Sequence, residues 1–130
     1  MLKTITIRTH GRDDMVDISS EVADAVRESG VSDGTCTVFT PHTTAAMTIN
    51  ENADSDVQAD IITGLNALAF EKMSFRHGEG NSPAHIKSSL VGCSETVIIS
   101  DGRLVLGTWQ GIYLCEFDGP RSRKVHIQIQ

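Results

Sequence analysis

The segment around Asp101-Gly102 is the feature that most constrains the fold of this chain. Residues 96–100 and 103–106 are extended apolar segments, and Asp-Gly is a dipeptide typical of a two-residue β-hairpin turn. Two further extended segments follow, at residues 112–117 and 124–129. We therefore expect consecutive strands in one sheet system. Their alternation predicts six core residues: Leu104, Leu106, Ile112, Leu114, Ile127 and Ile129.

The earlier part of the chain mixes strands with helices. Alternating or β-branched segments predict strands over residues 2–8, 34–40 and 45–49. Helical spacing with capping residues predicts helices over about residues 20–30, 53–70 and 82–92. Because strands and helices do not alternate regularly, we expect an α+β fold. Residues 1–130 should form one compact domain, with a mainly antiparallel or mixed sheet or sandwich and about three helices.

Charge and cysteine content exclude several classes of partner. The formal net charge is −6, from 17 acidic and 11 basic residues, which disfavours binding to nucleic acid. No apolar segment approaches the roughly 20 residues of a membrane span. The cysteines Cys36, Cys93 and Cys115 are odd in number and lie in or beside apolar segments. Buried free thiols in a reducing compartment explain them best, so we expect a cytoplasmic protein without a membrane partner.

Three histidines and two carboxylates interrupt the apolar pattern. His42 follows Pro41 at a strand interruption, and His77 and His85 flank a glycine-rich loop. Neutral imidazole is a common metal ligand, although His42 could instead bond a neighbouring threonine. Asp60 lies near the apolar stripe of the predicted helix over residues 53–70, and Glu51 shortly precedes that helix. A carboxylate at the edge of a buried face is either functional or structurally strained.

A basic cluster near the C-terminus stands out in this acidic chain. Arg121 and Arg123 are two residues apart, so on an extended strand they face the same side. Two guanidinium groups on one side can bind a phosphate, or they can pair with Glu116 or Asp118. Trp109 could stack on a ligand ring or fill the core.

In sequence order, these blocks resemble the YjbQ-like proteins, which are described as secondary thiamine-phosphate synthase enzymes. The resemblance spans nearly the whole chain, and the Gly-Thr-Trp-Gln and Asp-Gly-Pro-Arg blocks are its most specific parts. The matching segments are residues 42–46, 49–52, 84–87, 102–110 and 116–123, with the single residues Asp60, His77 and Asn81.

The resemblance implies a compact α+β homotrimer with pockets near the subunit boundaries. It implies that His42, His77 and His85 converge around a divalent ion, zinc before Mg²⁺. We expect secondary transfer chemistry on a phosphorylated or pyrophosphorylated small molecule, with Asp60 or Glu51 as acid or base. A non-catalytic metal- or ligand-binding module is the alternative. The expected substrate- or anion-binding residues are Arg121, Arg123, Thr43, Asn81, Trp109 and Gln110.

Overall fold

A computed structural model describes residues 1–68 and 70–130 and confirms the α+β class. Its strands are β1 (Leu2–Arg8), β2 (Asp14–Asp17), β3 (Gly34–Phe39), β4 (Ala45–Glu51), β5 (Ser94–Ser100), β6 (Arg103–Leu104), β7 (Gln110–Glu116) and β8 (Ser122–Ile129). Its helices are α1 (Ser19–Ser29), α2 (Ser55–Asn66) and α3 (Ser82–Val91), with a 3₁₀ turn, η1 (Phe70–Lys72).

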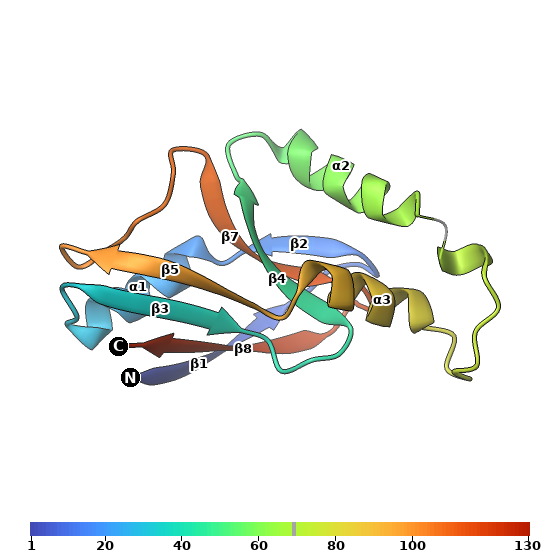
Figure 1. Ribbon diagram of the computed structural model, residues 1–130, viewed down its shortest axis with the longest axis horizontal. Coiled ribbons are helices and arrows are strands. Elements are labelled where there is room, and N and C mark those ends of the chain that lie inside the picture. The colour runs from blue at the N-terminus through green and yellow to red at the C-terminus, as the bar shows by residue number, and fades with distance from the viewer. Residues whose placement is uncertain (69) are drawn as a thin grey trace.

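Within the described residues, the strands form two antiparallel sheets. One sheet has the order β1-β8-β3-β5-β6, and the other has the order β2-β7-β4 (Figure 1). Ile112 and Leu114 lie on β7, whereas Ile127 and Ile129 lie on β8. The expectation of one sheet system is therefore wrong. All four side chains nevertheless share one core, because the two sheets pack face to face and α1 packs against them.

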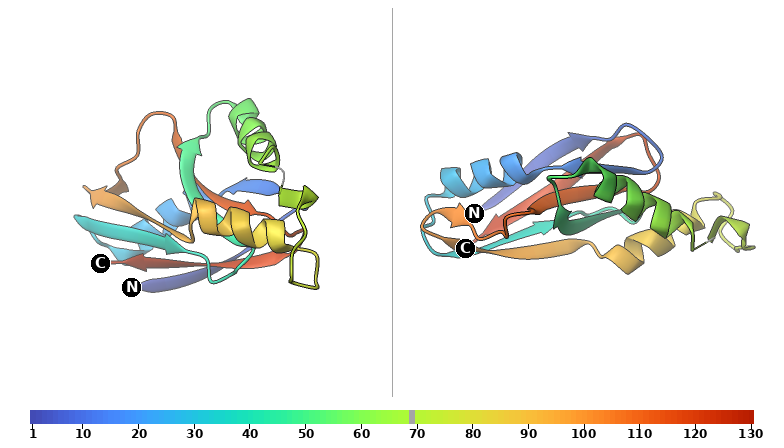
Figure 2. Two further views of the ribbon diagram at one scale, coloured as in Figure 1. Left: turned by 45° about the vertical axis from the view of Figure 1, so that its right-hand side comes forward. Right: turned by 90° about the horizontal axis from the view of Figure 1, so that it is seen from above.

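The central strand β7 is buried on both faces. Its inner face joins the core between the sheets, and Tyr113 and Cys115 on its outer face pack with Ala84 of α3. In Figure 1 and in the left view of Figure 2, α2 (green) lies outside the sheets, and none of its residues is fully buried. This double burial explains why residues 112–117 read as a nearly continuous apolar segment rather than an alternating one.

The Asp101-Gly102 hairpin is confirmed. Both turn residues have positive φ, 52° for Asp101 and 72° for Gly102, as a type I′ turn requires. The second strand is shorter than expected, because β6 ends at Leu104. Strand β2 was not predicted. Its four residues, Asp-Met-Val-Asp, have too few apolar positions to show a period, and they become a strand by pairing with β7.

The three predicted helices are present at the expected positions, but α2 is shorter than predicted. Helix α1 ends at Gly30, which adopts the left-handed conformation with a φ of 69°. Helix α2 ends at Asn66 instead of continuing to residue 70, and Leu68 beyond it is exposed. Residue 69, within the predicted helix, lies outside the described residues.

All three cysteines are free, but they are not all buried. Cys36 and Cys115 are in the core, where burial raises their thiol pKa values to about 11 and about 12. Cys93 is exposed just before β5, which corrects the expectation of three buried thiols. In the part of the chain that the structure describes, no helix is long and apolar enough to cross a membrane.

Candidate functional site

Three connections meet at one end of the two sheets and enclose a cavity of about 470 Å³. The first joins β3 to β4, the second leads from η1 to α3, and the third joins β7 to β8. The first and third cross from one sheet to the other, so their polar residues gather at the edge of the core. The cavity is lined by Pro41, His42, Thr43, Thr44, His77, Glu79, Asn81, His85, Asp118, Arg121 and Arg123.

The three candidate histidines line this cavity from different elements. His42 comes from the β3–β4 connection, His77 from the loop before α3, and His85 from α3 itself. The rings of His77 and His85 meet edge to face, with their centroids 5.5 Å apart. Nε2 of His77 lies 3.7 Å from a carboxylate oxygen of Glu79, a neighbour that the sequence analysis did not single out.

Arg123 is held in a buried network. Its Nε donates to Oε1 of Glu116 at 2.8 Å, and its Nη2 donates to Oε2 of Glu116 and, at 2.8 Å, to Oγ1 of Thr44. Thr9 donates its hydroxyl to the same carboxylate at 2.8 Å. Arg123 and Glu116 are almost fully buried, so most of this guanidinium charge is neutralised. Of the two interpretations of Arg123, phosphate binding or pairing with Glu116, the structure shows the pairing.

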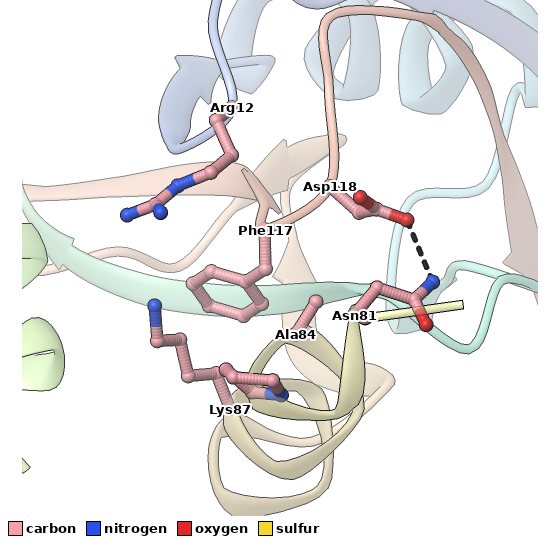
Figure 3. A pocket seen from close by; sticks show the side chains of 8 residues that line it. Arg12, Asn81, Ala84, Lys87, Phe117 and Asp118 are labelled. Carbon is pink, nitrogen blue, oxygen red and sulfur yellow. Dashed lines mark hydrogen bonds between the residues drawn. The ribbon is translucent and has the colours of Figure 1, made fainter. Parts of the chain in front are cut away.

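Arg121 keeps most of its donors for other partners. Its side chain is 50% exposed, and its Nη2 donates to Oδ2 of Asp118 at 3.1 Å. The other four guanidinium N–H groups carry no bond within the described residues. Asn81 donates Nδ2 to the same oxygen of Asp118 at 2.9 Å (Figure 3). The Arg121 guanidinium is therefore the cavity's available cationic donor.

A smaller cavity of about 80 Å³ adjoins the first, and Asn81 and Asp118 line both. Figure 3 shows the ends of Arg12 and Lys87 beside the ring of Phe117 in this second cavity. Lys87 is 1% exposed and bonds Asn66 of α2. Sequence reasoning missed this buried lysine, although its place on one helix face with Ala84 and Ser88 was a usable signal.

The histidines do not fit the expected three-ligand metal site as they lie. Nε2 of His42 accepts the backbone N–H of Lys124 at 2.9 Å, so this lone pair is already used. Among residues 1–68 and 70–130, no three His, Cys, Asp or Glu side chains are grouped closely enough to hold a metal ion. Zinc, or Mg²⁺, at His42, His77 and His85 therefore stays a prediction.

Glu51, Trp109 and Gln110 lie at the opposite end of the second sheet. Glu51 pairs with Gln110 in the register that pairs Ala45 with Glu116, so six residue steps separate them from the cavity end. That distance is about 20 Å along the strands. Trp109 is 62% exposed, which rules out a role as core filler. None of the three lines the cavity.

Asp60 is exposed on α2 and does not line the cavity either. The apolar stripe beside which it was predicted is only partly buried, so the argument from a desolvated carboxylate does not apply to it. Thr43 and Asn81, by contrast, do line the cavity. Expected residues are thus divided between the cavity, the far end of β7 and the surface of α2.

The fold and cavity define an α+β sandwich protein with a polar pocket, lined by histidine and arginine, at the end of its sheets. The chain belongs to the UPF0047 protein YjbQ-like family, whose model matches residues 3–130. A UPF0047 protein of Methanocaldococcus jannaschii is 54% identical over 129 residues, covering 99% of this chain and 94% of that protein. The UPF0047 protein YugU of Bacillus subtilis is 52% identical, covering 99% and 98%.

Solved structures share this fold closely. An uncharacterized conserved protein of the YjbQ/UPF0047 family from Clostridium acetobutylicum is 53% identical, with a TM-score of 0.96. The match covers 98% of this chain and 99% of that one. A protein of unknown function from Sulfolobus solfataricus is 32% identical, with a TM-score of 0.95, covering 99% and 95%. The recognised family is therefore confirmed.

Proposed function

We propose that the cavity binds a phosphorylated or pyrophosphorylated small molecule and supports transfer chemistry of the thiamine-phosphate-synthase type. The observation that carries the proposal is the set of hydrogen-bond donors lining one cavity of about 470 Å³: three histidines, two arginines and an asparagine, beside the carboxylates of Glu79 and Asp118. Imidazole N–H, amide N–H and guanidinium groups are the donors that bind phosphate oxygens. An acidic chain has little general attraction for anions, so a local group of such donors favours a specific anion site.

The proposed reaction requires stabilisation of a leaving group. When the C–O bond to a pyrophosphate breaks, both bonding electrons leave with the pyrophosphate oxygen, and the attacking ring nitrogen forms the new bond. A guanidinium beside the leaving group lowers the barrier by stabilising that growing negative charge. Arg121 suits this role better than Arg123, because Glu116 already neutralises Arg123. His77 and His85 lie nearer to such a ligand than Asp60 or Glu51 and are the better acid–base candidates.

A non-catalytic ligand-binding module is the second candidate. It is favoured by the position of Asp60 and Glu51, the two carboxylates expected to act as acid or base, outside the cavity. Binding of thiamine phosphate or pyrophosphate without turnover of the two substrates of thiamine-phosphate synthesis would support this module. Turnover that is lost in an Arg121 variant would support the enzyme.

Replacing Arg121 by lysine is expected to weaken the binding of inorganic pyrophosphate about tenfold, measured by isothermal titration. An ammonium keeps the charge but cannot reproduce the planar fork of a guanidinium. Arg121→Ala should weaken binding further. A tenfold change corresponds to about 1.4 kcal/mol of binding free energy, within the range of a charge-assisted hydrogen bond.

Arg103→Ala is the matched control for the Arg121 variants. Arg103 is an exposed arginine on β6 that does not line the histidine cavity, so its removal changes the net charge equally. We expect it to bind pyrophosphate as the wild type does. Equal affinity in wild type, Arg121→Lys and Arg121→Ala would contradict the proposed function and leave Arg121 as a partner of Asp118 alone.

We propose that the chain assembles as a homotrimer in the cytoplasm. Trp109 is largely exposed, and α2 has an apolar stripe without a fully buried residue, which suits subunit contacts. The free cysteines suit a reducing compartment. A trimer would also allow Glu51, Trp109 and Gln110 of one subunit to approach the cavity of another.

Sedimentation equilibrium is expected to give a mass three times the 14.1 kDa of one chain. A Trp109→Ser variant should shift the equilibrium toward smaller species if the indole is buried between subunits. Leu2→Ser is the control, because Leu2 is equally exposed but lies on β1, in the other sheet. A monomeric wild type at micromolar concentration would contradict the trimer.

A further inference from the structure

The ring of His42 extends the hydrogen bonding of the first sheet beyond the end of β3. The pairing of β3 with β8 ends at Phe39 and His126, after which residues 40–44 leave the sheet. Two side chains then take over from the missing backbone. Thr40 donates its hydroxyl to the carbonyl of Lys124 at 3.1 Å, and Nε2 of His42 accepts the N–H of Lys124 at 2.9 Å. The position of the ring is therefore set by the sheet.

This contact decides where the proton of a neutral His42 ring lies. A backbone N–H can only donate, so Nε2 must present a lone pair to Lys124. A neutral imidazole has one acceptor nitrogen and one N–H, so the proton is on Nδ1. His42 lines the cavity, and the one hydrogen-bond donor of its neutral ring is the N–H at Nδ1.

The charges around His42 favour the same uncharged form. Burial lowers its pKa first, and Arg123, Arg121 and Lys124 lower it further, while Glu116 alone acts in the opposite direction. Arg121 and Lys124 also disfavour a divalent metal ion at this ring and favour an anion, whereas the charge of Arg123 is largely neutralised by Glu116.

Either way of binding a metal through His42 would break the contact with Lys124. A metal on Nε2 would displace the N–H of Lys124. A metal on Nδ1 would leave the neutral ring's proton on Nε2, where it would face that N–H as a second donor. Within residues 1–68 and 70–130, the rings of His77 and His85 contact each other and Glu79 and accept no backbone N–H.

We propose that His42 donates a hydrogen bond from Nδ1 to the anion in the cavity and is not a metal ligand. The donor role rests on the proposed function, because it assumes that the cavity binds an anion. It makes His42 and Arg121 two donors from different connections that act on one oxyanion. The tautomer itself is a property of the protein without ligand.

Nuclear magnetic resonance of ¹⁵N-histidine-labelled protein without ligand tests the tautomer. We expect the His42 signals, assigned with His42→Gln, to show a protonated Nδ1 and an unprotonated Nε2 near neutral pH. The opposite tautomer overturns the proposal. Zinc titration followed in the same spectra should leave the His42 nitrogens unchanged. Zinc that shifts them directly, or zinc affinity that is lost in His42→Ala, also overturns it.

Titration with inorganic pyrophosphate tests the donor role. His42→Ala is expected to lose about tenfold in affinity, as for one hydrogen bond to a charged group. His42→Gln should retain more, because an amide offers both an acceptor for Lys124 and a donor. His10→Ala is the control, since His10 is exposed and lies outside the cavity.

The outcomes separate this inference from the proposed function. Equal pyrophosphate affinity in wild type, His42→Ala and His42→Gln overturns the donor role while leaving anion binding intact. A wild type that binds no pyrophosphate overturns the proposed function and the donor role together. The spectra of the unliganded wild type test the tautomer in either case, because a variant is used only to assign the His42 signals.

Discussion

Replacing Arg123 by methionine is expected to lower the free energy of unfolding by about 3–5 kcal/mol, measured by urea denaturation. The substitution leaves the fully buried carboxylate of Glu116 without its cationic partner, and an uncompensated buried charge carries a cost of that size. The bond to Thr44 at the end of the β3–β4 connection is lost as well. The effect should therefore be larger than that of any surface ion pair.

Arg27→Met is the matched control. Arg27 pairs with Asp24 on α1, and both side chains are more than half exposed, so the loss should stay below about 1 kcal/mol. The double variant Glu116→Gln, Arg123→Met should recover part of the lost stability, because it removes the unpaired charge. A cost for Arg123→Met no larger than that of Arg27→Met would show that the pair is unimportant for stability.

Acid should act on the same carboxylate. Burial by itself would raise the pKa of Glu116, but bonds from Arg123, the N–H of Asp118 and Thr9 outweigh it and hold the pKa below its ordinary value. A carboxyl group with a lowered folded-state pKa contributes stability above its unfolded pKa of about 4.3. That contribution is lost as the pH falls through the folded-state pKa. In Arg123→Met, this acid-dependent loss should be smaller.

Leu114→Ala is expected to lower the free energy of unfolding by about 2–4 kcal/mol. Leu114 lies on the inner face of β7, fully buried between the two sheets, with Met47 and Val16 opposite it on the neighbouring strands. The substitution removes buried methyl groups and leaves a cavity that strands held on both sides cannot close.

Leu90→Ala provides the comparison for Leu114→Ala. Leu90 lies on α3 and is 61% exposed, so its truncation should change the stability by no more than about 0.5 kcal/mol. Urea denaturation of both variants should give similar slopes, because the same fold unfolds. Similar stabilities for the two variants would be incompatible with a core position for Leu114.

Strand and turn positions were predictable because their causes are local. The alternation of Ile5 and Ile7 and the Asp101-Gly102 turn depend on neighbouring residues only. Sheet membership was not predictable. β7 and β8 are consecutive, yet they pair in different sheets, because the connection after Glu116 crosses the core. Strand β2 was not predicted, because its four residues include two charged ones and form a strand only by pairing with β7.

Residue types also indicated much of the site. His42, His77, His85, Asn81 and Arg121 were selected in advance, and all line one cavity. The pairing of Arg121 with Asp118 was one of the alternatives, because the two residues are neighbours in the chain. The contact of His42 could not be predicted, because its partner is far away in the chain. Nε2 of His42 meets an N–H that lies 82 residues away, and this contact turns an expected metal ligand into a proposed donor.

The sequence by itself determined the family, the α+β class, the hairpin and the residue types at the cavity. These follow from local propensities and from motifs that the chain carries whole. Only the tertiary structure decided that Arg123 is neutralised by Glu116 and that Arg121 keeps its donors. It also decided that Glu51 and Trp109 lie a strand length from the histidines. The physical reason is that desolvation, ion pairing and hydrogen-bond direction depend on where the chain crosses between sheets, and no local pattern encodes that crossing.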